Sequence, residues 1–342
     1  YTDWSRDSLI ARLHALESSS KPTTTIPTKA SLPQHKSSTF DFQSHPTRHI
    51  ALKFLYIGSH YNGLEYSGNA ASLPTVEEVL FLALLRARLV PPLPNSTDPE
   101  SVLAWPGPEA INYSKCGRTD KGVSAYDQVI GLTVRSRRPA ESTPGSENWD
   151  DEKDELPYPT ILNRLLPPTV RVLAWAPNPP ENFSARFNCA SRTYRYYFTN
   201  PMLSPLYDES GTLDIQAMQK AAAYFLGDHD FRNFCKLDAS KQITNFTRHI
   251  SVSRIVADTA TTNVGDGTAS SGVYFFELRG TAFLWHQVRH MMAILFLVGQ
   301  RLEAPEIVKD LLDIEKYPTK PVYQMAHEHP LVLWRCDFPE ID

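Results

Sequence analysis

The sequence has few cysteines and no long apolar run. Its four cysteines, Cys116, Cys189, Cys235 and Cys336, are far apart and form no CxxC pair. This spacing argues against a disulfide framework or a zinc cage, and a reducing compartment is the default for such a chain. No stretch approaches the roughly 18 consecutive apolar residues that a membrane span needs, so we expect no membrane contact. Because the chain begins with Tyr1 rather than Met, we expect it to be trimmed at its start. We expect the cytoplasm and nucleus as its locations.

The chain also lacks an excess of positive charge. It holds 34 Lys plus Arg against 38 Asp plus Glu, a formal charge of -4, which excludes a uniformly basic nucleic-acid binder. Residues 139–156 alone carry seven acidic residues and one lysine, a net -6, so the rest of the chain has +2. Residues 112–138 carry six basic and two acidic residues. The composition therefore leaves room for a localised basic cleft.

Motifs for cofactors are missing as well. The sequence has no P-loop, no dinucleotide fingerprint and no Gly-x-Ser-x-Gly elbow, so we expect no cofactor. His286 and His290 are four residues apart, as the two histidines of a zincin are, but Gln287 stands where the general-base Glu belongs and no third-ligand motif follows. A zinc hydrolase is therefore a weak alternative, and we expect no metal site.

The pattern of residues divides the chain into four parts. The spacing of apolar residues predicts a short helix within residues 1–17, and the Ser, Thr, Pro and Lys of residues 18–48 indicate a flexible linker. Two catalytic half-domains are expected at 49–182 and 183–342, the first interrupted by the acidic insert 139–156, which we expect to be solvated and mobile. Strands interspersed with single helices in both halves indicate an α+β protein of two similar half-domains.

The apolar periodicity predicts individual elements within these halves. Thr75 and Glu78 have the spacing of a capping box at the start of a helix. Further helices are expected at 214–225, 283–299 and 305–312. Strands are expected at 50–57, 128–134, 170–175, 193–198, 249–256 and 273–278.

One carboxylate stands out in the segment Cys116-Gly-Arg-Thr-Asp-Lys-Gly122. Asp120 lies between two glycines that permit a tight turn, and the adjacent Arg118 and Lys121 favour its ionised form. Such a carboxylate can act as a nucleophile and can receive a phosphate-bearing substrate. The alternative is an ordinary hairpin turn, because Asp and Gly are typical turn residues.

A second segment interleaves arginines with aromatic residues. Between residues 186 and 198, Arg186, Arg192 and Arg195 alternate with Tyr194 and its neighbouring tyrosines. On a strand, Arg192 and Tyr194 would share one face and Arg195 would lie on the other. Arginines beside a stacking aromatic hold extruded nucleotides in RNA-binding proteins. An aromatic strand with snorkelling arginines is the alternative.

Three further basic residues are candidates. Arg289 lies within the apolar segment 283–300, where a permanent charge requires an acidic partner or a substrate anion, and Asp120 is one candidate partner. An exposed position on the helix is the alternative. Arg232 and Lys236 follow the predicted helix 214–225 in a loop, where they could contact phosphate.

These three segments resemble the motifs of the TruA-type tRNA pseudouridine synthase family. The resemblance is carried by Gly117-Arg-Thr-Asp-Lys-Gly-Val-Ser-Ala125, by the Arg/Tyr segment 184–197 and by Ala282-Phe-Leu-Trp-His-Gln-Val-Arg-His-Met-Met292, in that order. Details such as Cys116, the segment 229–236 and Pro330-Leu-Val-Leu333 resemble the eukaryotic branch that modifies positions 38 and 39 of the anticodon stem-loop.

The resemblance implies a fold and a reaction. Its fold is two α+β halves with a catalytic cleft between their antiparallel sheets, and homodimers are common. It implies that Asp120 is the nucleophile, that Tyr194 stacks on the flipped base and takes the ring proton, that Arg289 pairs with Asp120 and that Arg118 holds the nucleotide. Attack at the uracil ring and attack at the ribose both stay open, as does a non-catalytic tRNA-binding or chaperone protein on the same fold.

Overall fold

The computed structural model describes residues 40–66, 68, 72–94, 96, 105–139, 149–202, 211–237, 243–258 and 272–339. The predicted helix within residues 1–17, most of the predicted linker and the centre of the acidic insert lie outside these residues. Phe42–Asp342 form one unit, separate from Tyr1–Asp41. The architecture that follows is that of the unit beginning at Phe42.

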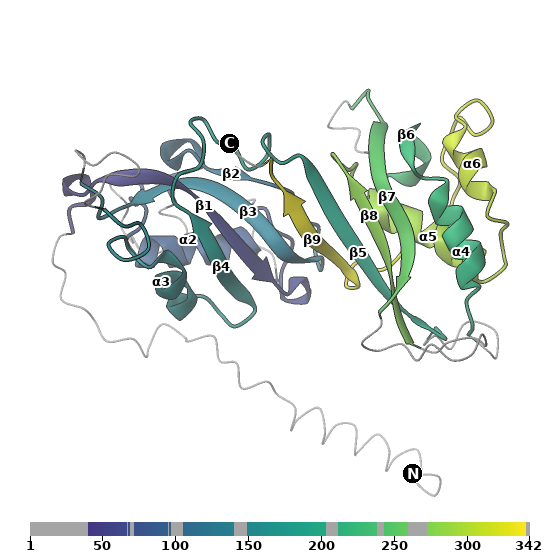
Figure 1. The fold of residues 1–342 in the computed structure, drawn as a ribbon, viewed down its shortest axis with the longest axis horizontal. Helices are drawn as coiled ribbons and strands as arrows, with labels where there is room; N and C mark the ends of the chain where they lie inside the picture. Colours follow the sequence, from purple (N-terminus) through teal and green to yellow (C-terminus); the bar gives the residue numbers. More distant parts are fainter. Residues whose placement is uncertain are drawn as a thin grey trace, which may run out of the picture. The chain divides into compact units, whose positions relative to one another are not determined.

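One sheet runs through this unit (Figure 1). Within the described residues it has nine strands in the order β4-β1-β3-β9-β5-β8-β7-β6, with the short β2 paired to β3. Neighbouring strands are antiparallel except β3 and β9, which are parallel. The strands are β1 (Thr47–Tyr56), β2 (Ser114–Lys115), β3 (Ser124–Arg135), β4 (Val170–Ala176), β5 (Ser191–Asn200), β6 (Gly227–Asp230), β7 (Thr247–Ala257), β8 (Gly272–Gly280) and β9 (Leu331–Asp337).

The C-terminal strand β9 joins the two halves of the sheet. It pairs in parallel with β3, where Val332 is opposite Ser124, and antiparallel with β5, where Leu333 is opposite Tyr194. The sheets of the two expected halves are therefore continuous through β9, a strand that the sequence analysis did not predict. The α+β class is confirmed, and the division of the chain at 182/183 stays a prediction.

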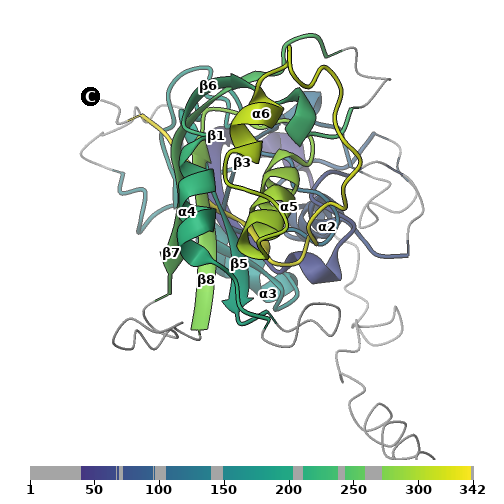
Figure 2. The same cartoon turned by 90° about the vertical axis from the view of Figure 1, so that its right-hand side faces the viewer.

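Helices cover one face of the sheet. They are α2 (Val76–Arg86), α3 (Tyr158–Leu165), α4 (Ile215–Ala223), α5 (Gln287–Gly299) and α6 (Ile307–Leu312). Figure 2 shows α4, α5 and α6 beside one another against the strands of the second half. None of the helices in the described part of the chain is both long and apolar enough to cross a bilayer.

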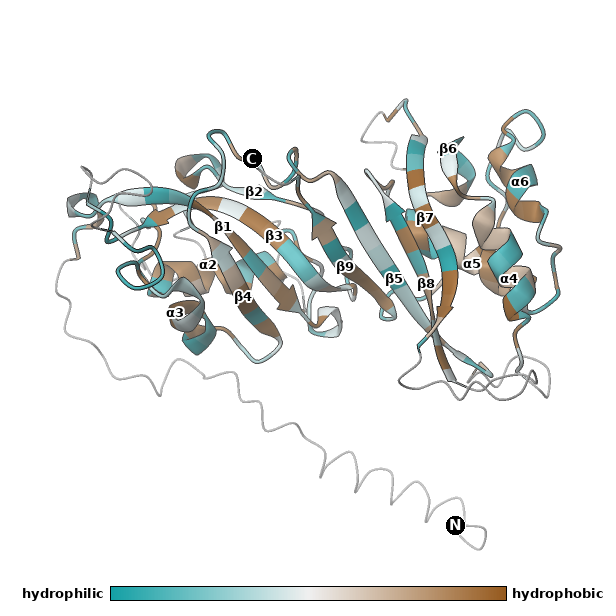
Figure 3. Cartoon of the chain, in the orientation of Figure 1, coloured by the Kyte–Doolittle hydropathy of each residue, from teal (hydrophilic) through white to brown (hydrophobic). Residues whose placement is uncertain are grey.

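The core lies between these helices and the sheet. Alternate residues of β1, from Ile50 to Tyr56, are at most 2% exposed, as expected for a strand with one covered face. Hydropathy colouring shows β1 and β3 as largely apolar and β5 as more polar (Figure 3), because β5 faces the core with tyrosines such as Tyr196. The other face of the sheet carries exposed side chains, among them Tyr126 and Leu173.

Two predicted helix starts have different outcomes. The capping box at the start of α2 is confirmed, since the Thr75 side chain accepts from the Glu78 amide and Glu78 accepts from the Thr75 amide. The predicted helix 283–299 begins later, at Gln287, because His286 adopts a left-handed conformation with φ 61° and ψ 11°. The four residues before α5 are thus free to form a loop.

The sequence predicts that the acidic insert is solvated, but its last two residues are buried. Its last residues, from position 149 on, fold against the start of β1, where the buried Arg48 lies 2.6 Å from Asp151 and 3.0 Å from Glu155. Glu155 is only 3% exposed. An internal cation within hydrogen-bond distance explains why these carboxylates leave water. The predicted linker 18–48 also ends earlier, because β1 begins at Thr47.

Candidate active site

The loop that contains Asp120 connects β2 to β3 and is held at its start by a buried glutamine. The side chain of Gln128, which is fully buried, accepts from the Gly117 amide at 3.2 Å and donates to the Gly117 carbonyl at 2.9 Å. The amide side chain thus replaces a strand partner, and it fixes the backbone three residues before Asp120.

The residue next to Asp120 is held from two sides. The Tyr56 hydroxyl lies 2.6 Å from the Thr119 hydroxyl inside the core, and the Leu64 amide donates to the Thr119 carbonyl. Gly63 has φ 88°, and a Cβ there would lie 3.0 Å from the Thr119 carbonyl oxygen. Both its conformation and this close approach therefore require a glycine at position 63.

Asp120 presents its carboxylate to two aromatic rings from the loop before α5. Trp285 Nε1 donates to Oδ1 at 3.2 Å, and His286 Nε2 lies 3.4 Å from Oδ2. The Asp120 side chain keeps 32% of its surface exposed. The carboxylate is therefore oriented by the Trp285 N–H group, lies beside the His286 ring and remains accessible.

His286 reaches Asp120 through a strained backbone. The left-handed conformation of a residue with a large side chain costs of order 1–3 kcal/mol and is concentrated at functional sites. Burial lowers the pKa of His286; Asp120 opposes this shift, and the charges of Arg289 and Lys236 add to it. The ring is therefore neutral at physiological pH.

The predicted ion pair between Arg289 and Asp120 is wrong in this structure. Arg289 is buried, as predicted, but its Nη2 donates to Glu328 at 2.7 Å and its Nε to the Ala326 carbonyl at 2.8 Å. The segment before β9 supplies both acceptors. It also contacts the loop that contains Asp120, because a Cβ at Gly122 would lie 2.6 Å from Glu328 Cγ.

Tyr194 lies on the covered face of β5, close to the same loop. Its hydroxyl would be 3.9 Å from a Cβ at Gly117, and its ring meets Phe283 edge-on with centroids 5.0 Å apart. Burial raises the pKa of Tyr194, so the hydroxyl stays protonated. The alternation predicted for this strand is also found, since Arg195 lies on the opposite face, against Trp334.

Four of the predicted RNA-contact residues have exposed side chains near the loop. Arg118 and Lys121 flank Asp120, and Arg118 meets the exposed Glu65 at 3.2 Å. Lys236 lies over the Trp285 ring, 4.7 Å from its centroid. Arg186 is exposed in the segment that precedes β5. These side chains are available to a phosphate backbone.

The other three predicted contacts have partners within the protein. Arg192 donates to the carbonyls of Cys116, Arg186 and Thr281. Arg195 is bonded to Glu277 on the open face of the sheet, and Arg232, in the 3₁₀ turn Arg232–Phe234, is bonded to Asp230. Their role in binding substrate stays a prediction.

The basic region 112–138 is divided by β3. This strand spans 12 residues, Ser124–Arg135, or roughly 36 Å at about 3.3 Å per residue. Arg135, Arg137 and Arg138 therefore lie at the far end of β3, away from Asp120. Lys115, near the loop, is paired with Glu77 and Glu65. The positive charge beside Asp120 is smaller than the count from the sequence predicts.

The structure also shows how the candidate metal ligands are placed. His286 precedes α5 and faces Asp120, while His290 lies on α5 with Nε2 3.4 Å from Lys320; the two do not share a helical face. In contrast, the sulfurs of Cys116, Cys189 and Cys336 lie within 4.8 Å of one another. Sequence distance is a poor guide because β9 pairs with β5.

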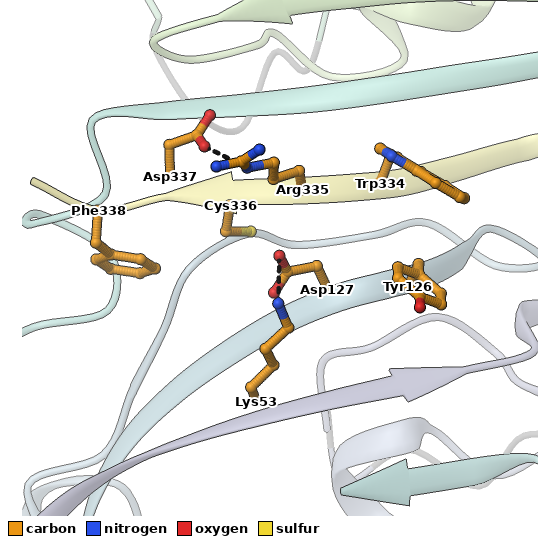
Figure 4. A pocket seen from close by; sticks show the side chains of 8 residues that line it. All are labelled: Lys53, Tyr126, Asp127, Trp334, Arg335, Cys336, Asp337 and Phe338. Carbon is orange, nitrogen blue, oxygen red and sulfur yellow. Dashed lines mark hydrogen bonds and ion pairs between the residues drawn. The ribbon is translucent and has the colours of Figure 1, made fainter. Parts of the chain in front are cut away.

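A surface hollow lies on the open face of the sheet, at β1, β3 and β9 (Figure 4). The ion pairs Lys53–Asp127 and Arg335–Asp337 cross it. None of the predicted site residues lines it; the lining is Lys53, Tyr126, Asp127, Trp334, Arg335, Cys336, Asp337 and Phe338. No residue of the loop of Asp120 lines this hollow.

Several residues of the site were missed by sequence reasoning. Gln128 and Tyr56 belong to strands that read as ordinary core, and Glu328 lies in a segment with no motif. Trp285 and His286 stand inside the third motif, but the predicted helix gave them no direction toward Asp120. The strained residue at the helix start could not be found from periodicity.

Comparison with known proteins agrees with this site. The tRNA pseudouridine synthase family model matches residues 221–339. The chain is 44% identical over 360 residues to the tRNA pseudouridine(38/39) synthase of Saccharomyces cerevisiae, covering all of this chain and 72% of the yeast protein. It is 44% identical to the human protein of the same name, over 88% of this chain and 58% of the human protein. It is 32% identical to a probable tRNA pseudouridine synthase of Caenorhabditis elegans, over 91% of this chain and 72% of the worm protein. The chain thus belongs to the TruA-type tRNA pseudouridine synthase family, in its eukaryotic branch.

Proposed function

We propose that this protein isomerises uridine to pseudouridine in tRNA, with Asp120 as the nucleophile. The observation that carries the proposal is the Asp120 carboxylate, which is accessible, lies on a clamped loop, accepts a hydrogen bond from Trp285 and has the His286 ring beside its second oxygen. A carboxylate oriented in this way can form a covalent intermediate.

The reaction conserves the atoms of the base. Asp120 attacks either the uracil ring or the ribose anomeric carbon, and the bond between the ribose and N1 breaks. The base then rotates, its C5 bonds to the ribose, the C5 proton leaves, N1 gains a proton and Asp120 is released. No redox or phosphate donor enters this balance. The uridine must first leave the base stack, since no side chain reaches it inside a helix.

The tRNA uridines at positions 38 and 39 are the proposed targets. The names of the yeast and human relatives support this choice. Exposed cations beside the loop, Arg118, Lys121, Arg186 and Lys236, provide contacts for the phosphates of the anticodon stem. Mapping pseudouridine in a tRNA pool before and after incubation should show gain at these two positions, and gain elsewhere alone would contradict the assignment.

The chemistry is tested by tritium release from transcript tRNA labelled at uracil C5. We expect release with the wild type and none with Asp120→Asn. Asp127→Asn is a matched control, because Asp127 is a buried carboxylate on β3 that pairs with Lys53, away from the loop. Release that persists in Asp120→Asn would refute the nucleophile.

The same assay separates catalysis from binding alone. A non-catalytic tRNA-binding or chaperone protein would bind tRNA without releasing tritium from any substrate. Binding to tRNA should weaken as salt rises, because exposed lysines and arginines displace counterions from the backbone.

The assembly and the cellular location complete the proposal. A homodimer is supported by the exposed apolar side chains on the open sheet face, where Tyr126 stacks on Trp334. Light scattering after size-exclusion chromatography should give twice the chain mass. A tRNA substrate is consistent with a location in the cytoplasm and nucleus. Imaging of the tagged full-length protein tests this location.

A further inference from the structure

Three buried thiols converge beneath the catalytic loop. Cys116 lies directly before Gly117, and Cys189 lies two residues before β5. Cys336 lies on β9, opposite Arg192 of β5. All three are free cysteines, at most 7% exposed, and their sulfurs lie within 4.8 Å of one another. Sulfur atoms from three separate parts of the chain thus share one small volume.

The spacing of the sulfurs fits a metal better than a covalent bond. A tetrahedral zinc with Zn–S bonds of about 2.3 Å sets its sulfurs roughly 3.8 Å apart. These three sulfurs therefore need to approach by no more than about 1 Å to reach that geometry. A disulfide would require a contact of about 2 Å and would leave the third thiol unpaired.

Charge around the cluster favours a divalent ion. Three thiolates and one Zn²⁺ carry a net charge of -1, and the Arg192 guanidinium, which donates to the Cys116 carbonyl at 2.8 Å, carries +1. A buried group needs such neutralisation. A monovalent copper would leave an extra negative charge. Soft thiolates are also the ligands that zinc accepts in structural sites.

We propose that Cys116, Cys189 and Cys336 form a zinc-binding site. The metal takes three thiolates and leaves its fourth position to water, because no further Cys, His, Asp or Glu of the described residues joins the group. Binding releases the thiol protons. The ion ties the start of the loop of Asp120 to the segment before β5 and to β9, the strand that joins the two halves of the sheet.

Cobalt uptake by the full chain tests the site directly. The protein is kept reduced with a phosphine, freed of metal and titrated with Co²⁺ and then Zn²⁺. We expect one equivalent of Co²⁺ with sulfur-to-cobalt charge-transfer absorption, and its loss when Zn²⁺ displaces it. Reduced wild type that takes up no cobalt and no zinc would overturn the proposal.

Single substitutions assign the ligands. Cys116→Ser, Cys189→Ser and Cys336→Ser should each weaken Co²⁺ binding by at least about 100-fold, since each removes one thiolate. Cys235→Ser is the matched control, because Cys235 is also free and buried but lies outside the cluster. Equal cobalt spectra in all four variants would refute the assignment.

Alkylation gives a second measurement that needs no variant. Relative to the metal-free protein, Zn²⁺ should slow the alkylation of the three thiols by iodoacetamide and leave the rate at Cys235 unchanged, as peptide mass spectrometry reports. Protection of none of the three, or a disulfide between two of them in protein that takes up no metal, would contradict the site. The result does not depend on pseudouridine formation, so it stands or falls separately from the proposed function.

Discussion

Replacing Gln128 by Leu should destabilise the protein and slow it. The substitution introduces an apolar side chain of similar size and leaves the Gly117 amide and carbonyl without the bonds they make at 3.2 and 2.9 Å. An unsatisfied buried polar group costs about 1–3 kcal/mol. Gly117 is half-buried, so water recovers part of that cost, and we expect a loss of about 2–3 kcal/mol for the two groups together.

Urea unfolding and tritium release measure the two effects. The free energy of unfolding should fall by the amount above, and turnover should fall by about 100-fold, because a shift of about 1 Å in a reacting group has that effect. Gln219→Leu is the control, since Gln219 makes one bond to the Ile255 amide at the surface, and its change should stay within about 0.5 kcal/mol. A Gln128→Leu protein as stable and as active as the wild type would refute the clamp.

Three further predictions concern pH, the acidic insert and Tyr194. Burial lowers the pKa of His290 to about 3, so below its ordinary pKa near 6.5 the unfolded chain binds a proton that the folded chain does not bind. In urea unfolding, the wild type should therefore lose about 2 kcal/mol more stability than His290→Gln when the pH falls from 6.5 to 5. Equal losses would contradict this. Arg48→Met should cost about 3–5 kcal/mol in thermal unfolding, because it strands the buried Glu155; an unchanged melting curve would show that the pairing contributes nothing. Tyr194→Phe should bind tRNA normally but release tritium about 100-fold more slowly, whereas Tyr194→Ala should also weaken binding; a Phe variant at the wild-type rate would assign Tyr194 to stacking alone.

The sequence predicts elements with strong periodicity and misses those defined by partners. The capping box of Thr75 and Glu78 and the strands around it follow from local patterns. Helix α3 was missed because it is short and has Pro159 in its first turn. Strand β9 was missed because the sequence of residues 331–337 does not indicate that it pairs with β3 and β5, which come from distant parts of the chain. Long-range pairing is not encoded in a local period.

The site divides in the same way. The loop of Asp120 is predictable, because a charged turn between two glycines is a local pattern. The partner of Arg289 is not, since Glu328 is 39 positions away and any buried carboxylate would satisfy the same requirement. The convergence of Cys116, Cys189 and Cys336 is equally invisible in a sequence without CxxC spacing, because it follows from the register of β9 against β5.

The pairing of Arg289 with Glu328 has a chemical consequence for Asp120. A carboxylate in a permanent ion pair with a guanidinium has its lone pairs occupied and its basicity reduced. Asp120 instead meets Trp285 and a neutral His286, so Arg289 does not occupy its lone pairs. The cation is nevertheless coupled to the loop, because Gly122 packs on Glu328 without room for a Cβ. Glu328 therefore contacts both Arg289 and the loop of Asp120, so a substitution at Glu328 would alter both contacts at once.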